Sequence, residues 1–342
     1  MSPARARPGL KSALGILVLA LAFALVEMRV VRVAMPGAFK RSSDVAEGVV
    51  HGVVAWRIYQ SRVLGPYLIA ALSGLTGSFL RAFDLLATLS LAFAGYATLA
   101  LTERLADGRR PPLAAFALLQ LTFLLLLITN WIYPWDLISI GVFTGFNYAV
   151  LARRRARVFA GLFALGILNH EIALFIPAWM IIDPLIRRGA RRDDGGPRPR
   201  FDRAMSLTGL ALLAGGAALV EGLRRTLLVE ETLSAAALPQ ASIYGRTLHL
   251  TLAQNWDEVR MGALSSLEGG NAILIPLFLV AVVALAIQLA RTDWMRCGAL
   301  SIVMLGMVGS FLLFADIYES RALMPLIPFV AMNGWQARAP RE

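Results

Sequence analysis

The chain has 342 residues, of which 58% are hydrophobic and 16% charged, and its formal net charge is +11. A soluble globular domain is about 45–50% apolar and about 25% charged, so this composition excludes an ordinary soluble fold and indicates a chain solvated by lipid. The basic residues lie in short segments between apolar stretches, which is typical of cytoplasmic loops and argues against a nucleic-acid partner. We therefore expect an all-α, polytopic transmembrane bundle of about ten helices, forming a single integral-membrane domain over residues 1–342.

Membrane spans are predicted first from the length of uncharged apolar stretches. A bilayer core about 30 Å thick needs about 20 apolar residues per helix. The first such stretch follows Arg5, Arg7 and Lys11, and we expect it to be a retained helix because no small-residue cleavage site follows it. In chain order, the predicted spans are residues 12–30, 84–101, 113–131, 137–151, 203–221, 271–290 and 297–315, with a shorter one at 322–336.

Residues 157–187 are predicted to form two short helices instead of one long helix. A single helix would place the arginine clusters at its two ends on opposite sides of the membrane, against the positive-inside bias. It would also bury the polar triplet Asn169, His170 and Glu171 near the middle of the bilayer, which is costly. Two short helices that meet at the triplet avoid both problems and place the triplet at the outer tip of a hairpin.

Three loops connect these predicted helices. The segment 187–203 is rich in Gly, Pro and Arg, and is predicted to be a cytoplasmic linker. Residues 222–270 form the longest polar segment, which is predicted to be extracytoplasmic. Residues 44–80 are expected to form amphipathic helices in the plane of the outer surface.

The placement of residues 63–80 is open to a second interpretation. This stretch carries no charge and is long enough to span, although Gly65, Pro66 and Gly77 weaken a helix. If 63–80 crossed the membrane, the N-terminus would lie outside. Counting basic residues on the cytoplasmic side slightly favours that rival topology.

The predicted outer face collects polar side chains next to apolar helices, and such residues are the informative ones in a membrane protein. They come from the first loop, the hairpin tip and the last outer turn: Asp44, Glu47, Arg62, Asn169, His170, Glu171, Glu319 and Arg321. A carboxylate can act as a general base, and arginine binds phosphate through two parallel hydrogen bonds. This combination fits chemistry on a lipid-linked phosphate and a hydroxyl acceptor.

Each of these residues also has a purely structural interpretation. The aromatic residues Trp131, Tyr133 and Trp135 are more typical of a membrane-interface belt than of substrate contacts. Asp44 and Glu47 are ordinary acids for the first turn of a surface helix. The hairpin tip is equally explained as a helix cap, and the last outer turn as a local ion pair.

Three short sequence patterns nevertheless occur together in this chain. An acidic residue in the first outer loop, Asp44, precedes amphipathic helices and the Arg-Val-Leu-Gly-Pro stretch at 62–66. A pair of short helices meets at the polar tip 169–171. A late Glu-Ser-Arg at 319–321 precedes a helix that contains Pro325. In these patterns, which are spread over most of its length, the chain resembles the GT-C superfamily of integral-membrane glycosyltransferases.

The resemblance implies an inverting transfer of a sugar from a polyprenyl-phosphate carrier to a hydroxyl of a lipid or glycan acceptor, at the extracytoplasmic face of the inner membrane. Asp44 would be the base, with Glu47 as the second choice. Arg62 and Arg321 would hold the donor phosphate, and the remaining polar residues would orient the substrates: Asn169, His170, Glu171 and Glu319. No cofactor and no metal are expected, because arginines can stabilise a phosphate leaving group.

Two other functions stay open at this point. A transporter or lipid flippase would need polar residues within the spans and paired broken helices in two related halves. The sequence shows one broken pair, at 157–187, and no internal repeat. A non-catalytic subunit of a membrane assembly is the remaining alternative.

Overall fold

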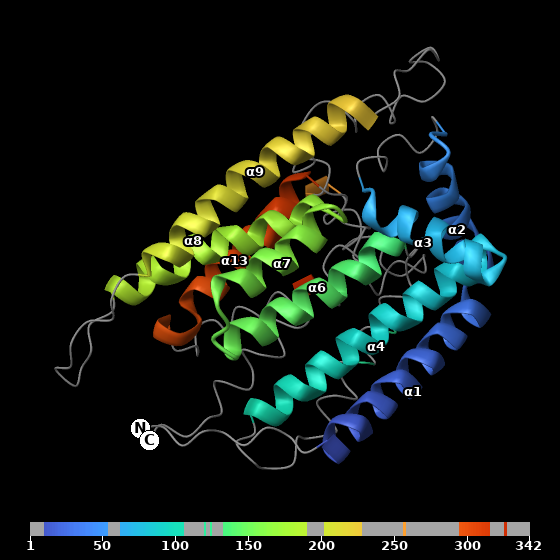
Figure 1. Cartoon of the computed structure of the whole chain (residues 1–342), viewed down its shortest axis with the longest axis horizontal. Helices are drawn as coiled ribbons and strands as arrows, with labels where there is room; N and C mark the ends of the chain where they lie inside the picture. The colour runs from blue at the N-terminus through green and yellow to red at the C-terminus, as the bar shows by residue number, and fades with distance from the viewer. Residues whose placement is uncertain are drawn as a thin grey trace.

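The computed structural model describes residues 10–53, 62–105, 120, 124, 133–189, 202–227, 256–257, 294–314 and 325–326. The elements with bounds in these ranges are all helical, with no strand among them (Figure 1): α1 (Leu10–Ala34), α2 (Pro36–Val50), α3 (Leu64–Thr76), α4 (Phe79–Leu105), α6 (Pro134–Leu151), α7 (Ala156–Ile167), η2 (Glu171–Leu174), α8 (Phe175–Gly189), α9 (Arg203–Leu227) and α13 (Trp294–Phe314). The predicted spans 113–131, 271–290 and 322–336 lie almost wholly outside the described residues.

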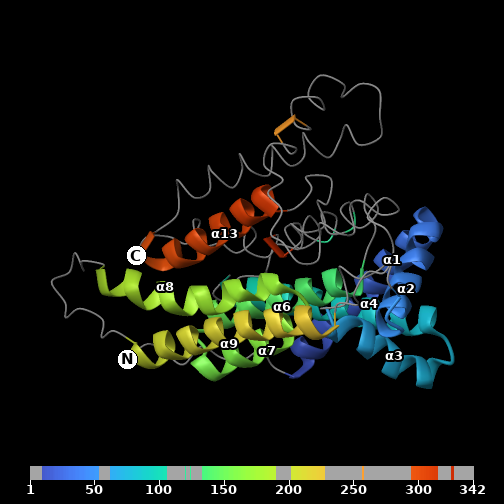
Figure 2. The same ribbon diagram turned by 90° about the horizontal axis from the view of Figure 1, so that it is seen from above.

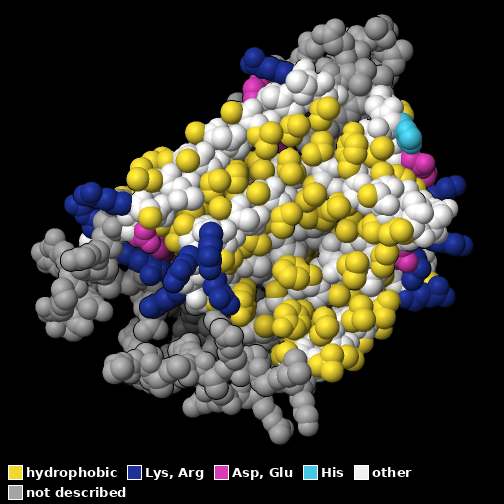
Figure 3. Space-filling model, in the orientation of Figure 1, with side chains coloured by type: hydrophobic (Ala, Val, Ile, Leu, Met, Phe, Trp, Pro, Cys, Tyr) yellow, Lys and Arg dark blue, Asp and Glu magenta, His cyan; other side chains and the backbone are white. Residues whose placement is uncertain are grey.

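Three described helices are long and apolar enough to cross a membrane: Ala13–Ala34, Phe79–Ala100 and Arg203–Leu227. Hydrophobic side chains form a broad band across the described helices, and charged side chains gather toward the helix ends (Figure 3). This distribution indicates a membrane protein, because such a band is stable only against lipid or another apolar surface. The full count of about ten membrane helices stays a prediction.

The helices α1 and α4 form an antiparallel pair that carries the first loop at one end. Arg32 of α1 forms an ion pair with Asp84 of α4, with 3.0 Å between Nη1 and Oδ2. Further along, a Cβ placed on Gly95 would lie 3.3 Å from the Cβ of Ala20. Because residue numbers rise along α1 as they fall along α4, the connecting helices α2 and α3 begin and end at the same end of the pair.

The helix α3 is too short to cross a bilayer core. It has 13 residues and ends at Gly77, whose left-handed backbone (φ 68°) lets its N–H bond to the Ser73 carbonyl. At about 1.5 Å per residue it rises about 20 Å, against about 30 Å for the hydrocarbon core. This geometry favours a surface position for the first loop over a membrane-crossing helix at 63–80.

The hairpin of α7 and α8 breaks where the sequence predicts. The helix α7 ends at Ile167, and His170 precedes the short turn η2, which leads into α8. The rings of Phe159 and Trp179 are 4.9 Å apart, and a Cβ on Gly166 would come within 2.8 Å of Ala173. These contacts place the two helices antiparallel, with a tight tip.

The helix α9 lies against this hairpin, and α13 packs against α8 (Figures 1 and 2). Glycines allow the close approach of α9, because a Cβ on Gly216 would lie 2.4 Å from the Phe163 ring and 3.1 Å from Leu174. The helix continues six residues beyond the predicted span 203–221, to Leu227. The extra turn brings Arg224 into line with the hairpin tip.

We expect Gly216→Leu to destabilise the protein, because the added side chain would meet Phe163 and Leu174 in a packed interface. Overpacking of this kind costs about 1–3 kcal/mol. Thermal unfolding in detergent measures the effect, with Gly215→Leu as the matched control because nothing lies within 4 Å of a Cβ there. Equal melting temperatures for the two variants would contradict the packing of α9 on the hairpin.

Candidate functional site

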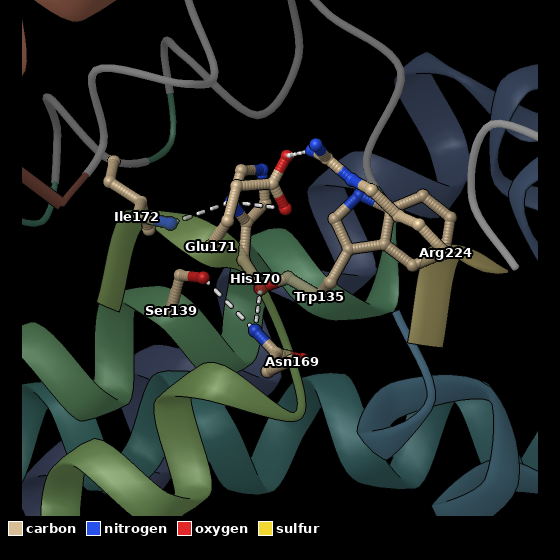
Figure 4. A network of polar contacts seen from close by, with 7 residues as sticks. All are labelled: Trp135, Ser139, Asn169, His170, Glu171, Ile172 and Arg224. Carbon is tan, nitrogen blue, oxygen red and sulfur yellow. Dashed lines mark hydrogen bonds and ion pairs between the residues drawn. The ribbon is translucent and has the colours of Figure 1, made fainter. Parts of the chain in front are cut away.

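The hairpin tip is fixed to α6 by the buried side chain of Asn169. Its Nδ2 donates hydrogen bonds to the Trp135 carbonyl oxygen at 2.7 Å and to Ser139 Oγ at 3.0 Å (Figure 4). Asn169 is 0% exposed, so both bonds are shielded from water and are costly to break. The tip therefore has a fixed position relative to the first turn of α6.

The start of α6 is itself built from local signals in the sequence. Pro134 occupies the first turn, where the missing N–H is no loss. The Asp136 carboxylate accepts a hydrogen bond from the Tyr133 backbone N–H at 3.1 Å. Trp135 is held between these residues, and its ring stacks on Tyr133 with 4.7 Å between centroids.

The first loop joins the same site through its backbone and through Arg62. The Leu64 N–H donates to the Leu168 carbonyl oxygen at 2.8 Å, which ties the start of α3 to the end of α7. The guanidinium of Arg62 lies over the Trp135 ring, 5.2 Å from its centroid. A cation in this position is attracted to the negative face of the indole.

Glu171 is the meeting point of charges from two further elements. Its Oε1 accepts a hydrogen bond at 3.5 Å from Nη2 of Arg224, which lies in the last turn of α9 (Figure 4). This distance is long for a charged hydrogen bond, so the pair is loose. The Oε2 of Glu171 lies 3.6 Å from His170 Nδ1.

His170 Nδ1 has two competing partners. It accepts a hydrogen bond from the Ile172 N–H at 3.2 Å, which requires an unprotonated nitrogen. In that state the approach to Glu171 is a close contact and not an ion pair. At the acidic pH where a glutamate titrates, an imidazole is ordinarily protonated, and its charge then adds to that of the arginines.

The pKa of Glu171 reflects this balance. Burial raises it, but the charges of His170, Arg62 and Arg224, together with a backbone hydrogen bond, outweigh burial and lower the pKa from 4.5 to about 2. Glu171 is therefore anionic under all physiological conditions. The fold keeps a permanent carboxylate at the tip, paired with Arg224 and influenced by the charge of Arg62.

The aromatic residues at the start of α6 correct one sequence-based interpretation. Tyr133 and Trp135 are 4% and 0% exposed, so they do not belong to an interface belt that faces lipid. They pack with Val45 of α2 in a small buried cluster. Trp131 lies outside the described residues.

The remaining predicted site residues fall into two groups. Asp44 and Glu47 are exposed on α2, on the side of the helix that Val45 does not share. The structure thus sets α2 beside Trp135, but it shows no contact from either acid to the Glu171 cluster. Glu319 and Arg321 lie outside the described residues.

Arg224 is the main residue that the sequence did not single out. Hydropathy ended the predicted span at residue 221, because Glu221 and Gly222 interrupt the apolar stretch. Two arginines in the last turn of a helix were a usable signal, because basic residues are favourable there and extend a helix. Nothing in the local sequence separates Arg224, which reaches Glu171, from Arg225, which pairs with Glu221 at 2.7 Å.

The assembled side chains suit an anion more than a metal. Arg62 offers guanidinium donors above the flat face of Trp135, and Arg224 offers them beside Glu171. Among the described residues, no group of three or more His, Cys, Asp or Glu side chains could hold a metal ion. Comparison with known proteins found no matching family model, curated protein or solved structure.

The lowered pKa of Glu171 predicts a pH dependence of stability. A carboxylate with a depressed pKa stabilises the fold fully above its unfolded pKa of 4.5, and this contribution is lost as the pH falls toward about 2. We expect the melting temperature of wild type to exceed that of Glu171→Gln at pH 6. This difference in melting temperature should shrink as the pH is lowered below 4.5.

Melting curves between pH 6 and pH 3 measure this effect. The control is Glu221→Gln, whose carboxylate is in an exposed pair with Arg225 and should change the melting temperature little at any pH. A gap between wild type and Glu171→Gln that does not change with pH would show that the charge of Glu171 is not what stabilises the tip.

Proposed function

We propose that this protein is a membrane glycosyltransferase of the GT-C type. It moves a sugar from a polyprenyl-phosphate carrier to a hydroxyl acceptor, a lipid or a glycan, at the extracytoplasmic face of the inner membrane. The observation that carries the proposal is the convergence of Arg62, from the first loop, and Arg224, from α9, on the hairpin tip at Glu171. Charged side chains at membrane depth pair with one another and mark substrate or ion pathways, which supports a ligand site here.

The phosphate of the donor is the ligand that this cluster fits best. Two guanidinium groups can each donate two parallel hydrogen bonds to phosphate oxygens. In the absence of donor, Glu171 pairs with Arg224 as an internal anion, through a loose contact of 3.5 Å that the singly charged phosphodiester of the donor can replace. The buried Trp135 beneath Arg62 keeps that guanidinium in place while its partner changes.

In the proposed transfer step, the acids of α2 and the arginines of the tip have separate roles. Asp44, or Glu47 in its place, takes the proton from the acceptor hydroxyl as the acceptor oxygen attacks the anomeric carbon of the sugar. The bond from that carbon to the phosphate oxygen breaks, and the phosphate leaves with the bonding electrons. Arg62 and Arg224 stabilise the charge that develops on the leaving oxygen, and Arg321 is expected to join them. The configuration at the anomeric carbon is inverted.

The sidedness of this site rests on the arginine-rich segments. The Glu171 tip lies at the opposite end of the hairpin from the turns that hold Arg153–Arg157 and Arg187–Arg188. Short arginine-rich loops stay on the cytoplasmic side, so the tip faces outward. Acids on α2 are then exposed on the same outer side, at the surface where an acceptor arrives.

One observation favours transport as a second candidate function. Glu27 of α1 is 3% exposed within a candidate membrane span, and neither of its carboxyl oxygens has a hydrogen-bond partner among the described residues. An ionisable side chain in this position is costly and is often part of an ion or proton pathway. Transport would then depend on Glu27 and not on the acids of α2.

A transfer assay in proteoliposomes, with a labelled polyprenyl-phosphate sugar, tests the two functions together. We expect Asp44→Asn to lower the rate about 10²–10⁴-fold, as for loss of a general base, with Glu47→Gln as the alternative site. Arg62→Lys should also be impaired, because a point charge does not replace the planar fork. Glu27→Gln and the exposed control Arg225→Gln should transfer at the wild-type rate.

The same assay can overturn the proposal. Full activity in both Asp44→Asn and Glu47→Gln would remove the proposed base. No transfer by wild type, together with movement of the labelled lipid across the bilayer that Glu27→Gln abolishes, would establish transport in place of glycosyl transfer.

A further inference from the structure

The end of the bundle opposite Glu171 carries a dense set of arginines that the proposed reaction does not use. We call it the basic end, and it comprises the turn between α6 and α7, the end of α8 and the start of α9: Arg153, Arg154, Arg155, Arg157, Arg187, Arg188 and Arg203. Lys and Arg side chains are visibly gathered there in Figure 3. The charges of Arg153, Arg187 and Asp202 all act on the Asp183 carboxylate, so the three elements lie together.

The fold neutralises little of this charge. Asp183 is engaged by Arg187, with 2.7 Å between Oδ2 and Nε, and Asp202 Oδ1 accepts from the Met205 N–H at the start of α9. The side chains of Arg155 and Arg157 are exposed, and their guanidinium groups make no hydrogen bond or ion pair with any residue that the structure describes. A net positive charge of this density attracts an anionic surface.

The backbone holds the cations in a defined place. Arg153 has a left-handed conformation (φ 49°), which costs a non-glycine residue about 1–2 kcal/mol. Its N–H bonds to the Val150 carbonyl at 3.1 Å, and that of Arg154 to the Ala149 carbonyl at 3.0 Å, so the turn is closed over the end of α6. The guanidinium of Arg154 lies 6.0 Å from the Tyr148 ring centroid. The arginines therefore project from a fixed turn.

Apolar side chains next to the basic end show which anion it fits. Val158, Leu185 and Leu207 are exposed, and each lies within about one helical turn of an arginine of this group. Hydrophobic side chains form a broad band across the described helices (Figure 3). A ligand with a phosphate beside long hydrocarbon chains satisfies both surfaces, whereas a nucleic acid or a free phosphate satisfies only the first.

We propose that the basic end binds the headgroup of an anionic phospholipid of the surrounding leaflet, with its acyl chains along Val158, Leu185 and Leu207. The arginines of the α6–α7 turn supply the phosphate contacts. This site is separate from Glu171 and does not rest on the proposed transfer reaction. The lipid would fix the depth of the hairpin base in the membrane.

Native mass spectrometry and thermal unfolding test this site in purified protein, with phosphatidylglycerol added against phosphatidylcholine. We expect phosphatidylglycerol, and not phosphatidylcholine or inorganic phosphate, to bind and raise the melting temperature. A triple variant, Arg153→Gln with Arg155→Gln and Arg157→Gln, should lose about tenfold to a hundredfold in affinity for phosphatidylglycerol. In phosphatidylcholine it should melt like wild type, which shows that it is folded.

Two controls separate a site from diffuse attraction. Replacing Arg29, Lys40 and Arg81 by Gln removes the same charge from exposed positions at the other end, and should leave phosphatidylglycerol affinity within about threefold of wild type. Lysine at 153, 155 and 157 should keep most of the affinity. Equal losses in the two Gln triples, a Lys triple as weak as the Gln triple, or a shift produced by inorganic phosphate alone would each overturn the proposal.

Discussion

Asn169 donates both hydrogens of its amide to the start of α6, and the rest of the site depends on these two bonds. A polar triplet inside a 31-residue apolar segment would be costly unless its groups were satisfied. The chain breaks the helix there and buries the asparagine, whose two amide hydrogens bond to the Trp135 carbonyl and to Ser139. The break positions α8, because α8 must then return alongside α7.

The same anchor brings distant parts of the chain to one place. The start of α3 bonds to the end of α7 through Leu64 and Leu168, so Arg62 arrives over Trp135. On the other side, Gly216 lets α9 approach Phe163 closely enough for Arg224 to reach Glu171 two turns later. The packing of the backbone thus determines which charged side chains meet at the tip.

Hydropathy and charge predict a helix well where the residues of that helix alone, an apolar stretch between charged ends, specify it. The break at Asn169–Glu171 was also predictable, because a polar triplet between two arginine clusters has few solutions in a bilayer. The partner of Glu171 was not, since Arg224 and Arg225 are equivalent in sequence and only the rotation of α9 on the hairpin separates them. Tyr133 and Trp135 have the composition of an interface belt, but the fold of the first loop covers them. Glu319 and Arg321, which the sequence places at the same outer face, remain predictions.

The central claim is that the Glu171 tip holds a phosphate, and binding of a polyprenyl phosphate tests it without assuming any reaction. Its affinity should be measured for wild type, Arg224→Gln and Arg225→Gln, three proteins that differ only at the end of α9. We predict that Arg224→Gln weakens binding about tenfold or more, as expected for loss of a charged hydrogen bond, and that Arg225→Gln stays within about twofold of wild type. Equal affinities for Arg224→Gln and wild type would show that the phosphate, if it binds at all, is held elsewhere.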